Sequence, residues 1–190
     1  MIEALHHCSE AERQAQFFLA DQQMNSVLSS SAGRLFDGIS AILGICRAST
    51  FEGQASMALQ FAAEAWEKDH PAPDVTPMAP IHGQDRLLLP TGVLVRQVLE
   101  GRLAGEAVGC LAYAFHQGLA AMIAGACLAV QEETGLHTVA LSGGVFQNRL
   151  LLRLCDQTLQ HLGFTVLKHS TVPPNDGGIA LGQAVYAAYT

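Results

Sequence analysis

The sequence predicts an α/β domain in which helices outnumber strands and a small sheet is at least partly parallel. Two short apolar runs, Thr138 to Leu141 and Phe164 to Leu167, have the length and composition of buried strands. The stretch between them, Asn148 to Leu162, has apolar residues at helical spacing. A strand–helix–strand unit of this length is expected to form a right-handed parallel crossover.

The other elements are expected to be mostly helical. Ser9 and Glu12 have the spacing of a capping box, which predicts a helix start. The proline-rich stretch from His70 to Pro80 is expected to be a linker or surface loop. Gly135 is the expected C-cap of a long Ala-rich helix. The remaining expected elements are helices over 32–45, 51–68, 92–100, 105–133 and 178–189 and a short strand over 86–89.

Composition narrows the functional classes. The 190 residues are 49% hydrophobic and 14% charged, so the chain either buries much surface internally or presents a large face to a partner or a missing domain. A net charge of −7 with two lysines argues against nucleic-acid binding. The window from Ala107 to Val130 is apolar, but we expect a buried helix there rather than a membrane span. Five scattered cysteines without a CxxC pair suggest reduced thiols in a cytoplasmic protein.

Two glycine-rich turns follow the two predicted strands. Ser142-Gly143-Gly144 follows the first, and Asn175-Asp176-Gly177-Gly178 comes after the second. Parallel strands place both turns at the carboxyl edge of the sheet, where open α/β folds bind ligands. Glycines let a backbone approach a phosphate, and the helix that follows offers free N–H groups. The pair of turns therefore predicts a site for a phosphorylated ligand, although a Gly-Gly pair taken alone is more typical of an ordinary tight turn.

The sequence allows more than one role for each of three further residues. Asp37 lies on a helix face with Gly33, Ser40 and Gly44, so it could meet a ligand or could be a solvated outer residue. Asp176 could ligate a metal or could cap the last helix through its side chain. His116 is expected to be a core histidine rather than a ligand.

In chain order, these segments resemble the C-terminal part of the HypF carbamoyltransferases, which mature NiFe hydrogenases. The resemblance covers residues 22 to 190 and leaves residues 1 to 21 as a helical extension of unassigned role. It rests on five segments, namely residues 29–37 with Leu43-Gly44, residues 51–55, Phe115-His116, residues 141–148 and residues 173–183. More distantly, the chain is similar to the enzymes that make threonylcarbamoyladenosine in tRNA and to antibiotic O-carbamoyltransferases.

The resemblance implies a helix-rich lobe of an actin-like ATPase (ASKHA) fold and a set of ligand-binding residues. In the family, ATP and carbamoyl phosphate give carbamoyl-adenylate, whose carbamoyl group passes to the C-terminal cysteine of HypE. The cofactors implied are ATP or carbamoyl-adenylate and a divalent metal, Mg or Fe. Asp37 would bind the ribose, and Asp176 would ligate the metal. The other residues expected at the nucleotide are Glu52, Gly53, Gln54, Ser142, Gly143, Gly144 and Asn148.

The sequence also departs from the family pattern. The HxxxH pair that shares the metal lies in a preceding lobe in the family, and it does not occur here. We therefore expect a fragment that carries half of the site, is inactive alone and has as partners the missing lobe, or its own dimer mate, and a HypE-like acceptor. Neither nucleic acid nor membrane is expected as a partner. The alternatives are a non-catalytic interaction module that forms homodimers and, more weakly, a lobe of a sugar or acetate kinase.

Overall fold

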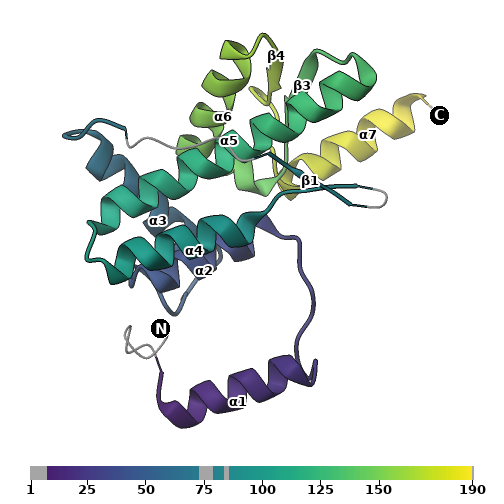
Figure 1. Ribbon diagram of the computed structural model, residues 1–190. Coiled ribbons are helices and arrows are strands. Elements are labelled where there is room, and N and C mark those ends of the chain that lie inside the picture. Colours follow the sequence, from purple (N-terminus) through teal and green to yellow (C-terminus); the bar gives the residue numbers. More distant parts are fainter. Residues whose placement is uncertain (1–7, 73–78, 84–85, 190) are drawn as a thin grey trace.

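The computed structural model describes residues 8–72, 79–83 and 86–189 of the chain (Figure 1). Helices dominate this part of the molecule, and two separate two-stranded sheets complete it. The predicted α/β class with helix in excess is therefore confirmed. The helices are α1 (Glu10–Asp21), α2 (Ala32–Ile42), α3 (Gln54–Glu67), α4 (Thr91–Leu103), α5 (Val108–Thr134), α6 (Arg149–His161) and α7 (Ile179–Tyr189).

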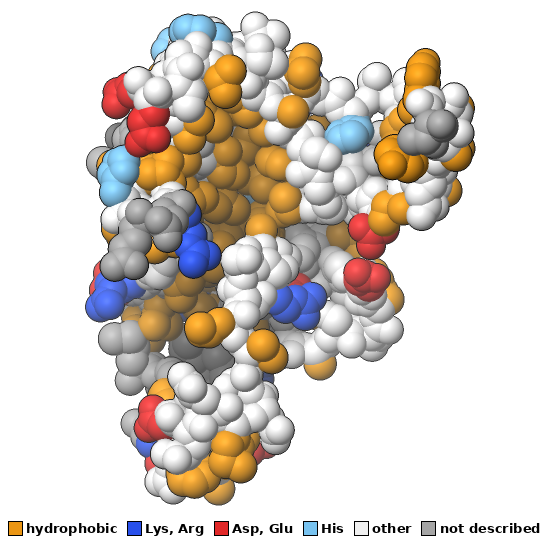
Figure 2. Space-filling view, turned by 90° about the vertical axis from the view of Figure 1, so that its right-hand side faces the viewer, with side chains coloured by type: hydrophobic (Ala, Val, Ile, Leu, Met, Phe, Trp, Pro, Cys, Tyr) orange, Lys and Arg blue, Asp and Glu red, His pale blue; other side chains and the backbone are white. Residues whose placement is uncertain are grey.

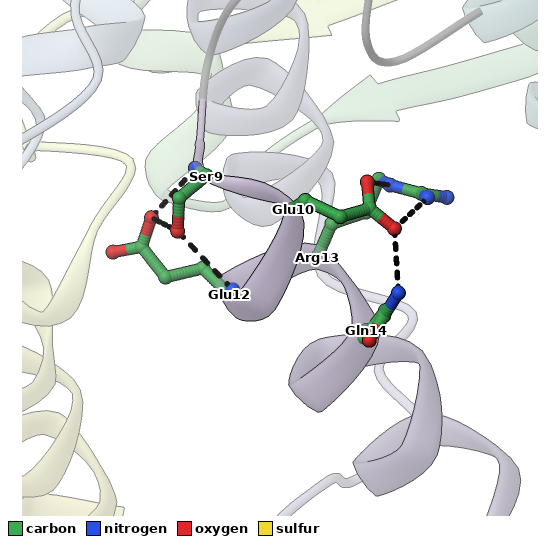
Figure 3. Close-up of polar contacts among 5 residues, drawn as sticks. All are labelled: Ser9, Glu10, Glu12, Arg13 and Gln14. Carbon is green, nitrogen blue, oxygen red and sulfur yellow. Dashed lines mark hydrogen bonds and ion pairs between the residues drawn. The ribbon is translucent and has the colours of Figure 1, made fainter.

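The N-terminal helix α1 stands apart from the body of the molecule (Figure 1). The predicted capping box is present: the Ser9 hydroxyl accepts from the Glu12 amide, and the Glu12 carboxylate accepts from the Ser9 amide (Figure 3). These reciprocal bonds satisfy two donors that a helix start leaves without partners. No α1 residue is buried, so the helix is held by its own caps and side-chain pairs rather than by packing.

The core is built around α5, which packs against α3, α4 and α6. Its buried residues run from Leu111 to Ala124 and include Phe115 and His116. By length and composition alone α5 could also span a membrane, and it is the one helix of this kind in the described ranges. Its packing against three helices accounts for the apolar sequence as that of a core helix, as expected. Gly135 ends the helix in a left-handed conformation, with φ of 71°.

The predicted parallel crossover is present at the C-terminal end of the core. Strand β3 (Thr138–Leu141) pairs in parallel with β4 (Thr165–Lys168), and α6 connects them. Register is set by Val139 opposite Val166, the half-buried residues of each strand that pack against the core. The opposite face of this sheet is open, because Ala140 and its partner Leu167 are exposed.

A second, antiparallel pair was only half predicted. Strand β2 (Leu87–Leu88) falls within the expected strand over 86–89, and it pairs with β1 (Ile81–His82). No strand was expected at 81–82, directly after the predicted linker. Part of that linker, residues 73–78, lies outside the described residues.

Helix α2 buries part of the face on which Asp37 lies among small residues. Phe36, Ile39 and Leu43 are buried and belong to the core. Ser40 was placed with Asp37 on the opposite face, yet it too is buried, and its hydroxyl has no hydrogen-bond partner. The face of small residues therefore turns inward in part, because α2 packs against both α3 and α4.

Helix α7 projects from the body toward the C-terminus (Figure 1). It begins one residue later than expected, because Asp176–Gly178 forms a 3-10 turn. None of its described residues is buried, although the helix is apolar on all sides. A helix of this composition is normally enclosed by other elements.

Candidate functional site

The two glycine-rich turns meet at the carboxyl edge of the β3–β4 sheet, as predicted. The Gly143 amide donates to the Pro174 carbonyl across 2.9 Å, which joins the turn after β3 directly to the segment after β4. We call Ser142, Gly143, Gly144, Asn148 and Asp176 the sheet-edge cluster. The first four follow β3, and Asp176 lies two residues beyond Pro174, so the pairing of the strands brings them to one edge.

Each residue of the turn after β3 has a structural role in that turn. Gly143 has φ of 99° and ψ of 158°, a conformation that side chains other than glycine rarely adopt. The Ser142 hydroxyl lies 2.8 Å from His169 Nε2, which ties the ends of the two strands together. A 3-10 turn over Gly144–Gln147 then leads to α6. The 3-10 turn therefore separates most of the glycine-rich turn from the start of α6.

Asn148 caps α6. Its Oδ1 accepts from the Leu151 amide at 2.9 Å, and its Nδ2 donates to His116 Nε2 at 3.0 Å. One of the free N–H groups expected at this helix start is therefore occupied by the Asn148 side chain itself. As a whole residue, Asn148 is half-buried.

Asp176 is exposed, and it opens the 3-10 turn that leads into the last helix. The neighbouring Asn175 is the capping residue, because its Oδ1 accepts from the Gly177 amide at 3.1 Å. The Asp176 carboxylate has the chemistry of a ligand for a hard divalent metal. In the described ranges, however, no group of three or more His, Cys, Asp and Glu side chains is arranged to hold a metal. Asp176 thus fits a metal as a single donor.

A second group of predicted residues lies where α2 meets α3. We call Asp37, Glu52, Gly53 and Gln54 the helix cluster. The Asp37 carboxylate accepts from the Ser56 hydroxyl of α3 at 3.4 Å and lies 2.7 Å from the Arg34 guanidinium. The Asp37 side chain is 27% exposed, so it is not a fully solvated outer residue, and its role toward a ligand stays a prediction.

The remaining residues of the helix cluster form the start of α3. Gly53 has φ of 78° and is the N-cap residue. The Gln54 Oε1 accepts from the Thr50 amide at 2.6 Å and so closes this turn. Glu52 is exposed. The structure thus brings Gly53 and Gln54 next to the α2–α3 contact at which Asp37 lies.

His116 contacts both the sheet-edge cluster and helix α2, and the sequence predicted only its burial. Its Nε2 accepts from Asn148 of the sheet-edge cluster, and its ring makes an edge contact with Phe36, the neighbour of Asp37, at 5.2 Å between centroids. Burial disfavours the charged ring and lowers the pKa of His116 from 6.5 to about 4, although the Ala112 carbonyl opposes this shift. His116 is therefore neutral at physiological pH.

Three contact residues were not singled out from the sequence. Ser56, which binds Asp37, and His169, which binds Ser142, are distant in sequence from their partners, whereas Arg34 lies only three residues before Asp37. The Phe115-His116 pair, one of the five segments that carry the resemblance, was the one sequence signal for His116.

Comparison with known proteins identifies the family. A family model described as "Carbamoyltransferase, Kae1-like Domain, second subdomain" matches residues 1–183, a range that includes the N-terminal extension. Carbamoyltransferase HypF of Rhodobacter capsulatus is 38% identical over 171 residues, which cover 90% of this chain and 21% of that protein. Carbamoyltransferase HypF2 of Cupriavidus necator is 36% identical over 179 residues, covering 85% of this chain and 22% of that protein. The chain thus spans about a fifth of the length of these relatives.

Solved structures agree with this result. The crystal structure of full-length HypF in the phosphate- and nucleotide-bound form superposes with a TM-score of 0.86 at 32% identity, over 97% of this chain and 24% of that one. The structure of T. kodakarensis HypF, with a TM-score of 0.77 at 24% identity, shows the same fold. From the matched range and these relatives, the chain belongs to the family of the second subdomain of the Kae1-like carbamoyltransferase domain, the domain found in HypF proteins.

Proposed function

We propose that this chain carries half of the nucleotide and metal site of a HypF-type carbamoyltransferase. The observation that carries the proposal is the Gly143–Pro174 hydrogen bond, which brings both glycine-rich turns to one sheet edge. A relative with the same fold was solved with phosphate and nucleotide bound, and this supports a nucleotide as the ligand. The proposed setting is cytoplasmic hydrogenase maturation.

Each residue would have a role that suits its chemistry. The partly exposed Asp37 carboxylate would accept from both ribose hydroxyls, and Glu52, Gly53 and Gln54 would lie along the adenosine. Ser142, Gly143 and Gly144 would lie against the phosphate side, with Asn148 donating through its remaining N–H. Asp176 would hold a divalent metal, Mg or Fe, together with donors from another lobe; such a metal would polarise phosphate oxygens.

The reaction proposed for the assembled enzyme follows the family. Carbamoyl phosphate is hydrolysed to carbamate and phosphate. The carbamate oxygen then attacks the α-phosphate of ATP, with pyrophosphate leaving. Finally, the cysteine sulfur of a HypE-like acceptor attacks the carbamoyl carbon, and AMP leaves. In this chain the sheet-edge and helix clusters would bind and orient the adenylate, whereas catalysis would require groups held on the opposite side of it.

The proposed partner is the remainder of a HypF-type chain, on the same polypeptide or a separate one. Two features support an incomplete assembly. Parallel sheets are normally covered on both faces, yet Leu167 on the outer face of the β3–β4 sheet is 54% exposed. On α7, Leu181 and Val185 are each about half exposed. Figure 2, which views the side from which α7 projects, shows apolar side chains gathered over a hollowed area. About four-fifths of the length of each of these relatives lies outside the part that this chain matches, and we propose that this remainder covers these surfaces.

The same surface supports a second candidate function. If copies of this chain cover one another at α7, the chain would be a non-catalytic module that forms homodimers. Sedimentation equilibrium separates the two functions. A half-site lobe is expected to remain monomeric until the complementary HypF-type polypeptide is added and then to form a one-to-one complex. A stable homodimer that fails to bind that polypeptide would favour the interaction module.

The nucleotide role is tested by calorimetric titration with ATP in the presence of Mg²⁺. Asn148→Ala is a poor probe, because it also removes the α6 cap at a cost of about 1 kcal/mol of stability. Asp37→Asn keeps the size of the side chain and removes the charge that would bind the ribose. Asp69→Asn is the matched control, since Asp69 lies beyond the far end of the 14-residue α3, about 20 Å from the Asp37 contact.

A further inference from the structure

His116 is a fully buried polar side chain whose two ring nitrogens both have partners. Nδ1 lies 2.7 Å from the carbonyl oxygen of Ala112, one turn earlier in α5. A carbonyl oxygen can only accept, so Nδ1 carries the proton of the neutral ring. Nε2 is therefore an acceptor, and it lies 3.0 Å from Asn148 Nδ2. The backbone of α5 thereby fixes the tautomer that the Asn148 amide requires.

The Asn148 amide is fixed from both of its ends. Oδ1 accepts from the Leu151 amide, and Nδ2 donates to His116 Nε2. If the amide were turned by 180°, Nδ2 would face the Leu151 amide, so that two donors would meet. Oδ1 would then face His116 Nε2, so that two acceptors would meet. These two contacts leave the second N–H of Nδ2 unused.

The His116 ring also packs against Phe36 of α2, the helix that carries Asp37. Phe36 contacts His116 edge-on at 5.2 Å and Phe115 at 5.0 Å between ring centroids, and all three side chains are buried. An apolar side chain of similar volume would fill this space without the cost of burying an imidazole. Packing alone therefore does not account for a histidine at this position, whereas the bond to Asn148 does.

We propose that His116 is a positioning residue that sets the orientation of the Asn148 amide, and hence the N–H that Asn148 presents to a nucleotide. The consequence for the ligand rests on the proposed nucleotide half-site. The effect on Asn148 does not, because it follows from contacts within the chain.

The first test is a measurement on the unaltered chain. Long-range nitrogen–proton NMR correlations distinguish the two ring nitrogens of a histidine. Protonated Nδ1 and unprotonated Nε2 at neutral pH are expected for His116. A proton on Nε2 would overturn the proposal, because Nε2 could then not accept from Asn148.

The second test compares His116→Phe, which keeps a ring and removes the acceptor, with His116→Gln, which retains an acceptor. Amide hydrogen exchange is measured at Leu151, whose amide Asn148 caps, and at Leu159, a buried residue of the same helix. In His116→Phe the Leu151 exchange rate is expected to rise at least tenfold relative to that of Leu159. In His116→Gln the ratio is expected to stay within threefold of wild type. An equal rise at both amides in His116→Phe would show that His116 only fills the core.

The ligand arm repeats the ATP titration on the same variants. His116→Phe is expected to weaken ATP binding about tenfold, and His116→Gln to leave it within threefold of wild type. Unchanged ATP affinity in His116→Phe would overturn the ligand part of the proposal. If the wild-type chain binds no ATP, the nucleotide half-site fails, and the exchange ratios still decide the positioning role.

Discussion

Burial of neutral His116 makes the stability of this chain depend on pH. The native pKa is about 4, against 6.5 for an unperturbed histidine, so between these values the unfolded chain binds a proton that the native chain excludes. The stabilisation is fully present above pH 6.5 and is lost as the pH falls toward 4. From these two pKa values, lowering the pH from 7 to 5 should reduce the free energy of unfolding by about 2 kcal/mol.

The assay is urea denaturation at pH 7 and pH 5, followed by circular dichroism. The quantity compared is the change in unfolding free energy between the two pH values, so a constant offset in a variant's stability cancels. His116→Gln cannot titrate and should lack the 2 kcal/mol term. His161→Gln, which changes an exposed histidine at the end of α6, should retain it. Equal pH dependence in wild type and His116→Gln would refute the assignment of this term to the buried ring.

Three further predictions concern stability, each with an internal control. Phe36→Ala should lower the free energy of unfolding, measured by urea denaturation, by about 3–5 kcal/mol, because Phe36 is buried in the core. Phe17→Ala on the exposed α1 should change it by less than about 0.5 kcal/mol. Comparable losses in the two variants would contradict the described core. Gly143→Ala should lower the free energy of unfolding by about 1–3 kcal/mol, because the backbone at Gly143 has φ of 99°. Gly144→Ala should be nearly neutral, because no atom lies closer than 3.9 Å to the added carbon. A larger loss in Gly144→Ala than in Gly143→Ala would refute the turn geometry. Ser9→Ala should speed exchange at the Glu12 amide without lowering the thermal midpoint of the body, and a global loss of stability would show that α1 packs against it.

The elements that the sequence predicted well are those with local physical causes. The Ser9–Glu12 box and the Gly135 C-cap depend only on neighbouring residues, so their patterns are readable without the fold. Strand β3 was predicted with its observed bounds, because a glycine-rich turn follows its apolar run directly. The 81–82 strand was missed since two residues carry no periodicity.

The features that were not predictable depend on contacts between distant segments. Ser40 lies on the same helix face as Asp37, but only the packing of α4 as well as α3 on α2 determines that it is buried. Asn175 and Asp176 can both cap a turn, and the backbone geometry selects Asn175. The link between His116 and Asn148 joins residues 32 positions apart, so no local pattern could reveal it.

For the candidate site, the sequence predicted which turns meet, and the structure supplies how they are joined. The carboxyl-edge placement followed from the parallel crossover, and the Gly143–Pro174 bond confirms it. The assignments of Asp37, Asn148 and Asp176 to ribose, nucleotide and metal stay predictions.

The measurement that tests the proposed half-site most directly is the ATP titration of the wild-type chain, Asp37→Asn and Asp69→Asn. We expect saturable one-to-one binding by the wild type. Loss of a hydrogen bond to a charged group costs about 1.5–3 kcal/mol, so Asp37→Asn should weaken binding by about tenfold to a hundredfold. Asp69→Asn should bind as the wild type does. Absence of binding by the folded wild-type chain, or equal affinity in all three proteins, would contradict a nucleotide half-site built on Asp37.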